Sequence, residues 1–265
     1  MDTAFNCTQC GKCCHNLHIP LSVREAHEWL SRGHKIKILT EAIPWVKGYS
    51  STDEVLMRKE SMTFEGVSGE ISIRVLVTLV GYFSDGCPNL DLNQNCTIYE
   101  SRPLTCRIYP FEMNPKIILD PNNKLCPSEA WQLVKSNQKL SNQLFLIDLQ
   151  TKNNINKIYA DSIQDVRLKE LLCISLEIKA CSLSNNGYLF HHVDQLKLLE
   201  IINKITSNPN ASIKDTEKSI DWMIYSLSTK TLEDLNALGS HASYPEPELM
   251  DKMLKKTREF ISLIP

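Results

Sequence analysis

The sequence predicts an α+β fold, in which a loop-rich cysteine-cluster domain on a small β-sheet is followed by an all-helical region. Three observations predict this class: a dense group of cysteines at the start of the chain, an alternating apolar segment over residues 70–83, and helical periodicity in the second half. With 265 residues, the chain is long enough for one large domain or two small ones. We expect two domains, residues 1–130 and residues 131–265.

The first half contains clear signals for two kinds of element. Residues 18–21 are expected to form a short strand, and Ser22 with Glu25 three residues later forms a capping box, which predicts the start of a helix. Residues 40–70 contain proline, glycine and a Ser/Thr run and are expected to be irregular. Between residues 70 and 83 every second position is apolar, which predicts a strand.

The second half has the periodicity of helices. Candidate helices cover residues 128–150, 161–180, 190–207, 212–228, 231–238 and 244–263. The third of these carries an apolar stripe at helical spacing, which is typical of a core-facing surface, formed by Leu196, Leu199, Ile202 and Ile205. Cys173 and Cys181 lie in apolar segments of the sequence, and we expect both to be buried as small hydrophobic residues.

Composition excludes several classes of function. The net charge of −2 indicates no strong attraction to nucleic acid. The start of the chain has neither the basic nor the apolar region of a secretory signal, and the longest apolar stretch, residues 71–83, is too short to cross a bilayer. We therefore expect a soluble, cytoplasmic protein with no nucleic-acid or membrane partner. In a reducing cytosol, clustered cysteines are more often metal ligands or redox groups than disulfides.

Eight of the ten cysteines fall within residues 1–126, and their spacing indicates metal ligation. The first run, C-T-Q-C-G-K-C-C, contains C-x-x-C-x-x-C, the spacing with which bacterial ferredoxins hold a [4Fe–4S] cluster. Zinc accepts the same thiolate ligands. Two of the later cysteines are followed by proline, as also occurs in the ferredoxin run. The candidate metal ligands are Cys7, Cys10, Cys13, Cys14, Cys87, Cys96, Cys106 and Cys126.

The doublet Cys13–Cys14 bears on how these thiols are used. Neighbouring side chains diverge, so the two sulfurs cannot easily point at one metal, and one of them is expected to serve a different site from Cys7 and Cys10. Eight thiolates equal two four-ligand sets, either two tetrahedral sites or two cubane clusters. One cluster with spare thiols is the alternative.

Other side chains near the cysteines are candidates for supporting roles. Arg102 and Arg107 flank Cys106, where a guanidinium can hydrogen-bond to sulfur and offset negative charge around a bound cofactor. Surface ion pairs with nearby glutamates are the alternative for both arginines. His15 and His18 follow the first run and are candidate ligands of a mixed Cys/His site.

The spaced elements C-x-x-C-G-K-C-C, C-P-N-L, C-x-I-Y-E-x-R-P-x-x-C-R-x-Y-P and a final Cys-Pro resemble a known family. This is the family of bacterial CxxCxxCC proteins, the YkgJ-like zinc- or iron-chelating domain proteins. The resemblance covers roughly residues 5–130 and implies metal binding by the eight cysteines. One branch, the flagellin lysine N-methylases, combines this cysteine cluster with S-adenosylmethionine, so the resemblance also implies protein methyl transfer as an alternative.

Three functions therefore remain open. We favour a protein that holds an iron–sulfur cluster, with [4Fe–4S] as the expected type. A structural or storage zinc protein and an S-adenosylmethionine-dependent protein lysine N-methyltransferase are the alternatives, and an iron–sulfur oxidoreductase is a further enzymatic possibility. No G-x-G-x-x-G turn occurs, which argues against a Rossmann-type cofactor domain. The sequence identifies no catalytic residue and leaves open which protein partner or substrate is bound.

Overall fold

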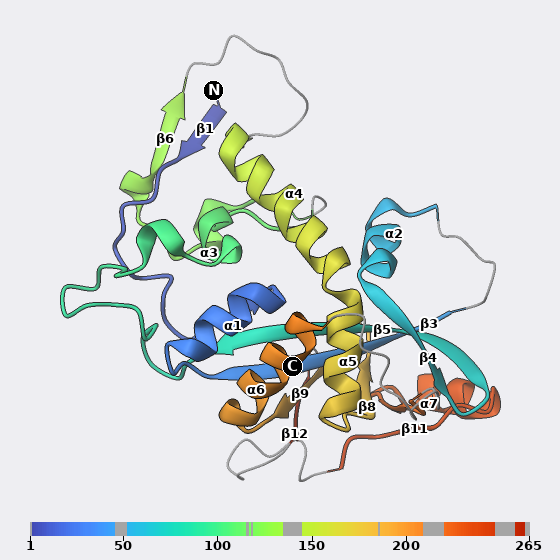
Figure 1. Cartoon of the computed structure of the whole chain (residues 1–265). Coiled ribbons are helices and arrows are strands. Elements are labelled where there is room, and N and C mark those ends of the chain that lie inside the picture. Colours follow the sequence, from blue (N-terminus) through green and yellow to red (C-terminus); the bar gives the residue numbers. More distant parts are fainter. Residues whose placement is uncertain are drawn as a thin grey trace. The chain divides into compact units, whose positions relative to one another are not determined.

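The computed structural model divides the chain into two compact units (Figure 1). The cysteine unit contains residues 1–19 and 82–160, and the sheet unit contains residues 20–81 and 161–265. Each unit is built from segments far apart in the sequence. The structure describes residues 2–45, 52–114, 117, 119–134, 145–184, 186–208, 220–246 and 258–262.

The cysteine unit has a small sheet with the strand order β6-β1-β7, in which β1 is antiparallel to β6 and parallel to β7. These strands are β1 (Asp2–Phe5), β6 (Trp131–Val134) and β7 (Phe145–Leu146). Its helices are η1 (Tyr99–Ser101), α3 (Leu104–Ile108), η2 (Pro121–Asn123), η3 (Ser128–Ala130) and α4 (Leu149–Gln164), whose last residues belong to the sheet unit. A small apolar cluster of Leu104, Ile108 and Ile158 joins α3 to α4.

The sheet unit is organised on a nine-stranded mixed sheet, whose main path is β11-β10-β8-β3-β5-β2. Strand β4 pairs with β5, and β9 pairs with both β3 and β12. The strands are β2 (His18–Leu21), β3 (Ile36–Pro44), β4 (Thr63–Ser68), β5 (Ile71–Tyr82), β8 (Ala180–Leu183), β9 (Gly187–His192), β10 (Met223–Tyr225), β11 (Ala242–Ser243) and β12 (Arg258–Ser262). The first two residues of β2 and the last residue of β5 belong to the cysteine unit. The helices are α1 (Val23–Ser31), α2 (Glu54–Ser61), α5 (Val166–Ser175), α6 (Gln195–Ser207) and α7 (Thr229–Ala237).

Strand β5 confirms the strand predicted over residues 70–83. It lies beside β3 (Figure 1). The two strands are antiparallel, from the pair of Ile36 with Gly81 to the pair of Pro44 with Ile73. Its alternating apolar side chains are buried, as period-two patterning requires of a strand with one face on a core. The buried set is Ile73, Val75, Val77 and Leu79.

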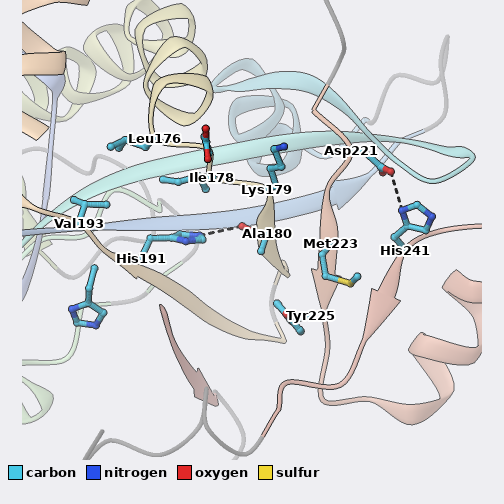
Figure 2. Close-up of a pocket in the computed structure, with 12 residues that line it drawn as sticks. Leu176, Ile178, Lys179, Ala180, His191, Val193, Asp221, Met223, Tyr225 and His241 are labelled. Atoms are coloured by element: carbon cyan, nitrogen blue, oxygen red, sulfur yellow. Dashed lines mark hydrogen bonds and ion pairs between the residues drawn. The ribbon is translucent and has the colours of Figure 1, made fainter. Parts of the chain in front are cut away.

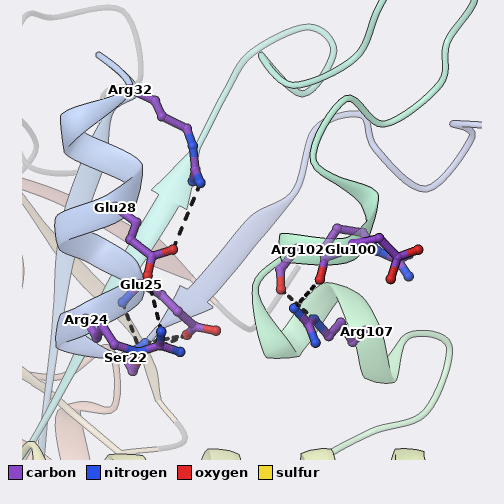
Figure 3. A network of polar contacts seen from close by, with 8 residues as sticks. All are labelled: Ser22, Arg24, Glu25, Glu28, Arg32, Glu100, Arg102 and Arg107. Carbon is purple, nitrogen blue, oxygen red and sulfur yellow. Dashed lines mark hydrogen bonds and ion pairs between the residues drawn. The ribbon is translucent and has the colours of Figure 1, made fainter.

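Helix α1 begins at the predicted capping box (Figure 3). The Glu25 backbone N–H donates to Ser22 Oγ over 3.2 Å, and the Ser22 N–H donates to Glu25 Oε2 over 2.9 Å. The backbone N–H of Val23, the first residue of α1, donates to Asp165 Oδ2 over 2.7 Å. These bonds satisfy N–H groups that a helix start leaves without intrahelical partners.

The α+β class is confirmed, and two parts of the element assignment are corrected. Residues 40–70 are not irregular, because they contain the end of β3, then α2 and β4. The later half is not all-helical, since it also supplies β8, β9 and β10. These strands are short and mostly buried. A continuous apolar segment of this kind lacks the alternation of apolar and polar residues that distinguishes a strand from a helix.

Several predicted helices agree only in part with the structure. The first residues of the segment predicted to be helical over residues 190–207 form the end of β9, and α6 begins only at Gln195. Helix α6 buries Leu198, Ile202 and Ile205, while Leu196 is 79% exposed. The predicted helices over residues 128–150, 212–228 and 244–263 lie partly outside the described residues, and their described parts include β6, β10 and β12. None of the helices in the described ranges is both long enough and apolar enough to cross a membrane.

Candidate metal centre

All ten cysteines are free thiols, and the eight candidate ligands all belong to the cysteine unit. Cys10 is exposed, and the other seven are partly buried. Cys173 and Cys181 are buried in the sheet unit, as the sequence analysis expected. The fold therefore separates two buried thiols from a group of eight that remains accessible.

The first cysteine run forms a tight loop. Gln9 and Gly11 have positive φ angles of 57° and 70°, and the Cys14 N–H donates to the Gly11 carbonyl over 2.8 Å. A Cβ atom on Gly11 would lie 2.7 Å from the carbonyl oxygen of Gln94. Only glycine therefore fits at this position, where the run lies directly against the loop around Gln94.

Backbone hydrogen bonds bring the later cysteines to this loop. The Cys87 N–H donates to the Cys14 carbonyl over 2.7 Å. Leu90 and Cys96 form an isolated antiparallel bridge, and the Leu90 N–H donates to the Cys87 carbonyl over 3.0 Å. These main-chain contacts link the segments that carry Cys14, Cys87 and Cys96.

A second set of main-chain contacts links the start of the run to the last cysteine. The pairing of β1 with β6 is extended by one bond, from the Asn6 N–H to the Ala130 carbonyl, over 2.9 Å. Cys7 follows directly on one chain, and Cys126 lies just before η3 on the other. The Leu125 N–H, next to Cys126, donates to the Tyr109 hydroxyl over 3.3 Å.

The thiols influence one another's ionisation. Burial, together with the smaller effect of neighbouring thiolates, raises the pKa of Cys106 to about 12 and that of Cys126 to about 11. Burial also raises the pKa of Cys87. A hydrogen bond between the doublet thiols lowers the pKa of Cys13 to about 7 and raises that of Cys14. Gathered thiols resist ionising together, and a bound cation would remove this resistance because thiolates are the form that ligates metals.

Arg102 supplies positive charge at the cysteines. Its guanidinium carbon lies 3.6 Å from the centre of the Tyr99 ring, and its Nε donates to the Tyr99 carbonyl over 2.8 Å. From this position its charge lowers the pKa of both Cys13 and Cys106, although other causes are larger at each thiol. Burial raises the pKa of Tyr99, the charge of Arg102 lowers it, and the nearby Cys7 thiolate adds to the rise. The structure therefore gives Arg102 the surroundings that a charge-compensating residue needs.

Arg107 occupies a different position from Arg102. Its Nη2 donates to the Glu100 carbonyl over 2.6 Å and its Nε donates to the Arg102 carbonyl over 2.8 Å (Figure 3). These bonds join α3 to the preceding turn. Arg107 therefore helps to fix the loop that carries Arg102 and Cys106.

A metal site needs several donor side chains close enough to bind one ion. In the described part of the chain, no group of three or more His, Cys, Asp or Glu side chains is arranged so that it could hold a metal ion. His15 Nδ1 lies 3.2 Å from the Gly11 carbonyl, and His18 begins β2. The chemistry of the thiols nevertheless fits, because soft thiolates select zinc and iron–sulfur clusters. Binding requires the side chains to close around the metal.

A separate pocket of about 650 Å³ lies in the sheet unit, and the sequence analysis did not anticipate it (Figure 2). His191 Nε2 lies 2.9 Å from Thr40 Oγ1 and 3.1 Å from the Ala180 carbonyl, while His241 Nδ1 pairs with Asp221 Oδ2 over 3.0 Å. His191 ends β9, whereas the sequence analysis placed it in a helix. No sequence motif identifies the pocket, because its lining comes from strand ends that are distant along the chain.

The fold and the thiols define a protein with a cysteine-rich unit suited to soft metals. A family model described as "Putative zinc- or iron-chelating domain", CxxCxxCC, matches residues 6–139, just over half of the chain. The chain belongs to this family, which confirms the resemblance found in the sequence and supports metal chelation. The match does not show a relationship to the flagellin methylases. No curated protein matches the chain, and no solved structure matches it.

Proposed function

We propose that this protein holds an iron–sulfur cluster through the thiolates of its cysteine unit. The observation that supports this most strongly is the gathering of eight free thiols from separate chain segments into one unit. Main-chain hydrogen bonds between Cys14 and Cys87 and between Asn6 and Ala130 hold those segments together. All-thiolate ligation is typical of iron–sulfur clusters and of structural zinc sites.

Two features favour iron–sulfur over zinc. The spacing C-x-x-C-x-x-C is that of cubane clusters, whereas four-cysteine zinc sites commonly use two separate C-x-x-C pairs. Pro88 and Pro127 directly follow Cys87 and Cys126, as a proline does in the ferredoxin run. Zinc remains the alternative metal, and the family description includes it.

The apolar core of the cysteine unit suggests that the bound group also stabilises the fold. Of the 35 buried apolar side chains in the described residues, five belong to this unit: Ile19, Leu104, Ile108, Ala130 and Ile158. A unit with so little buried apolar surface gains little stability from the hydrophobic effect alone. Metal–thiolate bonds that join its loops would therefore contribute to the free energy of folding.

Protein methylation with S-adenosylmethionine is a further proposal that rests on the resemblance alone. It predicts that metal-replete protein binds S-adenosylmethionine in a calorimetric titration. Absence of a binding signal with metal-replete protein would count against it.

The proposed function is tested by anaerobic purification followed by absorbance spectroscopy and by iron, zinc and acid-labile sulfide analysis. We expect broad visible absorption with iron and sulfide in equal amounts, as a cubane cluster requires. Cys173→Ala is the matched control, because it removes a buried thiol of the sheet unit and should keep the full metal content. Protein that contains zinc without sulfide would favour the alternative, and protein that takes up neither metal would contradict metal binding.

A further inference from the structure

We propose that the pocket of the sheet unit binds a small zwitterionic molecule with an apolar side chain, of the chemical class of the α-amino acids. All residues that line this pocket belong to the sheet unit, so the inference does not depend on metal binding by the cysteine unit. The pocket volume of about 650 Å³ lies in the range of small-molecule sites. Such sites combine apolar walls with a few polar groups in fixed positions.

One wall of the pocket is made where three parallel strands begin. Strand β10 lies between β8 and β11 and is parallel to both. Ala180 of β8 is paired with Met223 of β10, and the Ile224 N–H donates to the carbonyl of His241, the residue before β11, over 2.8 Å. The hydrogen bonds of the sheet therefore place Ala180, Met223 and His241 side by side, and all three line the pocket.

Two interlocked turns fix the main chain of His241. Its N–H donates to Ser68 Oγ over 3.1 Å, and the Glu70 N–H donates to the Gly239 carbonyl over 2.9 Å. Gly69 has a φ angle of 56°, and a Cβ atom there would collide with the carbonyl oxygen of Gly239. The turns thus approach so closely that only glycine fits at position 69.

The side chain of His241 is held as firmly as its main chain. The Gly69 N–H donates to Asp221 Oδ1 over 2.9 Å, and Asp221 Oδ2 lies 3.0 Å from His241 Nδ1 (Figure 2). Because the carboxylate accepts a hydrogen bond, the neutral imidazole carries its proton on Nδ1 and offers Nε2 as an acceptor. Within the part of the chain that the structure describes, Nε2 has no hydrogen-bond partner. The pocket therefore holds a positioned acceptor for a donor such as an ammonium group.

Charged side chains on the pocket wall favour a ligand that carries both signs. Glu177 and Lys179 lie two residues apart between α5 and β8, and both are exposed. Neither forms an ion pair with another described side chain. With Asp221, the lining contains two carboxylates and one ammonium group. A purely anionic ligand would meet two like charges and a purely cationic one would meet Lys179, whereas a zwitterion complements both signs.

The remaining lining suits an apolar side chain on the ligand. Ile178, Val193 and Met223 all line the pocket. Met223 is 36% exposed although it lies in a strand, so its thioether is available for contact. Methionine adapts its shape to different apolar partners. The pocket therefore combines an apolar surface with the acceptor of His241 and the ammonium group of Lys179.

The inference is tested by isothermal titration calorimetry of the full chain. The probes are L-leucine, L-methionine and L-phenylalanine, each with its amide, which lacks the carboxylate, and its N-acetyl derivative, which lacks the ammonium group. We expect at least one amino acid to bind and both of its derivatives to bind at least about ten-fold more weakly, because each leaves a charged partner unmatched. Absence of binding by all three amino acids, or equal affinity for an amino acid and its derivatives, would overturn the proposal.

Variants of the two charged residues assign the groups of the ligand. Lys179→Met should weaken binding of the amino acid about ten-fold and leave the affinity for its amide unchanged, since the amide has no carboxylate to lose a partner. Glu177→Gln should weaken the amino acid and leave the N-acetyl derivative unchanged. Lys197→Met is the matched control, because Lys197 is exposed on α6 and does not line the pocket. Equal losses for the amino acid and its amide in Lys179→Met would overturn the pairing of the carboxylate with Lys179.

Nuclear magnetic resonance of the histidine rings tests the role of His241 without a change to the pocket. The ring signals of His241, assigned by their absence from His241→Gln, should shift when wild-type protein is titrated with the amino acid that binds in calorimetry. The signals of His27, which lies on α1 and does not line the pocket, should stay in place. Binding without a shift at His241 would show that the ligand lies elsewhere and would overturn the site.

Discussion

Substituting Gly11 by alanine tests whether the first cysteine run has the loop geometry described above. Gly11 has a φ angle of 70°, and a left-handed conformation costs an alanine about 1–2 kcal/mol. The new Cβ would also lie 2.7 Å from the Gln94 carbonyl oxygen, and forcing extra atoms into a packed site costs about 1–3 kcal/mol. Together these terms predict a loss of about 2–5 kcal/mol in the free energy of unfolding.

Gly33→Ala is the matched control for this substitution. Gly33 has a φ angle of 80°, but a Cβ there would meet no atom within 4 Å, so that only the backbone term of about 1–2 kcal/mol applies. Urea unfolding of the reduced, metal-free variants, followed by circular dichroism, measures both losses. Gly11→Ala should also lower the metal content, while Gly33→Ala should not. Equal stability losses and equal metal contents in the two variants would refute the reasoning.

Three further perturbations are expected to have measurable effects. Arg102→Ala removes positive charge beside Cys106 and should weaken metal binding about ten-fold, as measured by competition against a chromophoric chelator. An unchanged metal affinity would contradict a charge-compensating role for Arg102. Burial lowers the pKa of Lys169, so this lysine binds fewer protons in the folded than in the unfolded protein. The free energy of unfolding should therefore rise with pH between the pKa of Lys169 in the folded protein and the ordinary lysine pKa of 10.5. Lys169→Met should remove that part of the rise in urea unfolding at a series of pH values, and the same slope in both proteins would show the inference to be wrong. Ser22→Ala removes the capping interaction with Glu25 and should lower the free energy of unfolding by about 1 kcal/mol in thermal or urea unfolding. Ser22→Thr should retain most of the wild-type stability. Equal stability of all three proteins would argue against the cap.

Local signals in the sequence predicted those elements whose stability is decided locally. The capping box of Ser22 and Glu25 involves hydrogen bonds across three residues, and it marks the start of α1. The alternation through β5 reflects one buried face, and Val75 and Val77 lie on it. Such patterns can be read without knowing what the element packs against.

Elements whose form depends on distant partners were missed. Strand β8 contains only Ala180–Leu183 and is held in the sheet by β3 and β10, neither of which is near it in the sequence. Strand β9 was taken for the start of a helix because its buried run carries no alternation. Short buried strands of this kind are specified by tertiary pairing, which single-sequence patterns do not contain.

The candidate site shows the same division. The identity of the eight cysteines is evident in the sequence, because their motifs are local. The pairing of Cys14 with Cys87, and of Asn6 with Ala130, emerges only from the fold, since the members of each pair are far apart along the chain. The positions of Arg102 above Tyr99 and of Arg107 on backbone carbonyls likewise depend on the turn that η1 and α3 form.

X-ray absorption spectroscopy of anaerobically purified protein tests most directly whether the thiols hold an iron–sulfur cluster. We expect absorption at the iron edge, with sulfur as the only kind of atom bound directly to iron and with iron neighbours at a longer distance, as in a cubane cluster. Iron coordinated by nitrogen or oxygen, or zinc alone with sulfur ligands at about 2.3 Å, would contradict the proposed function.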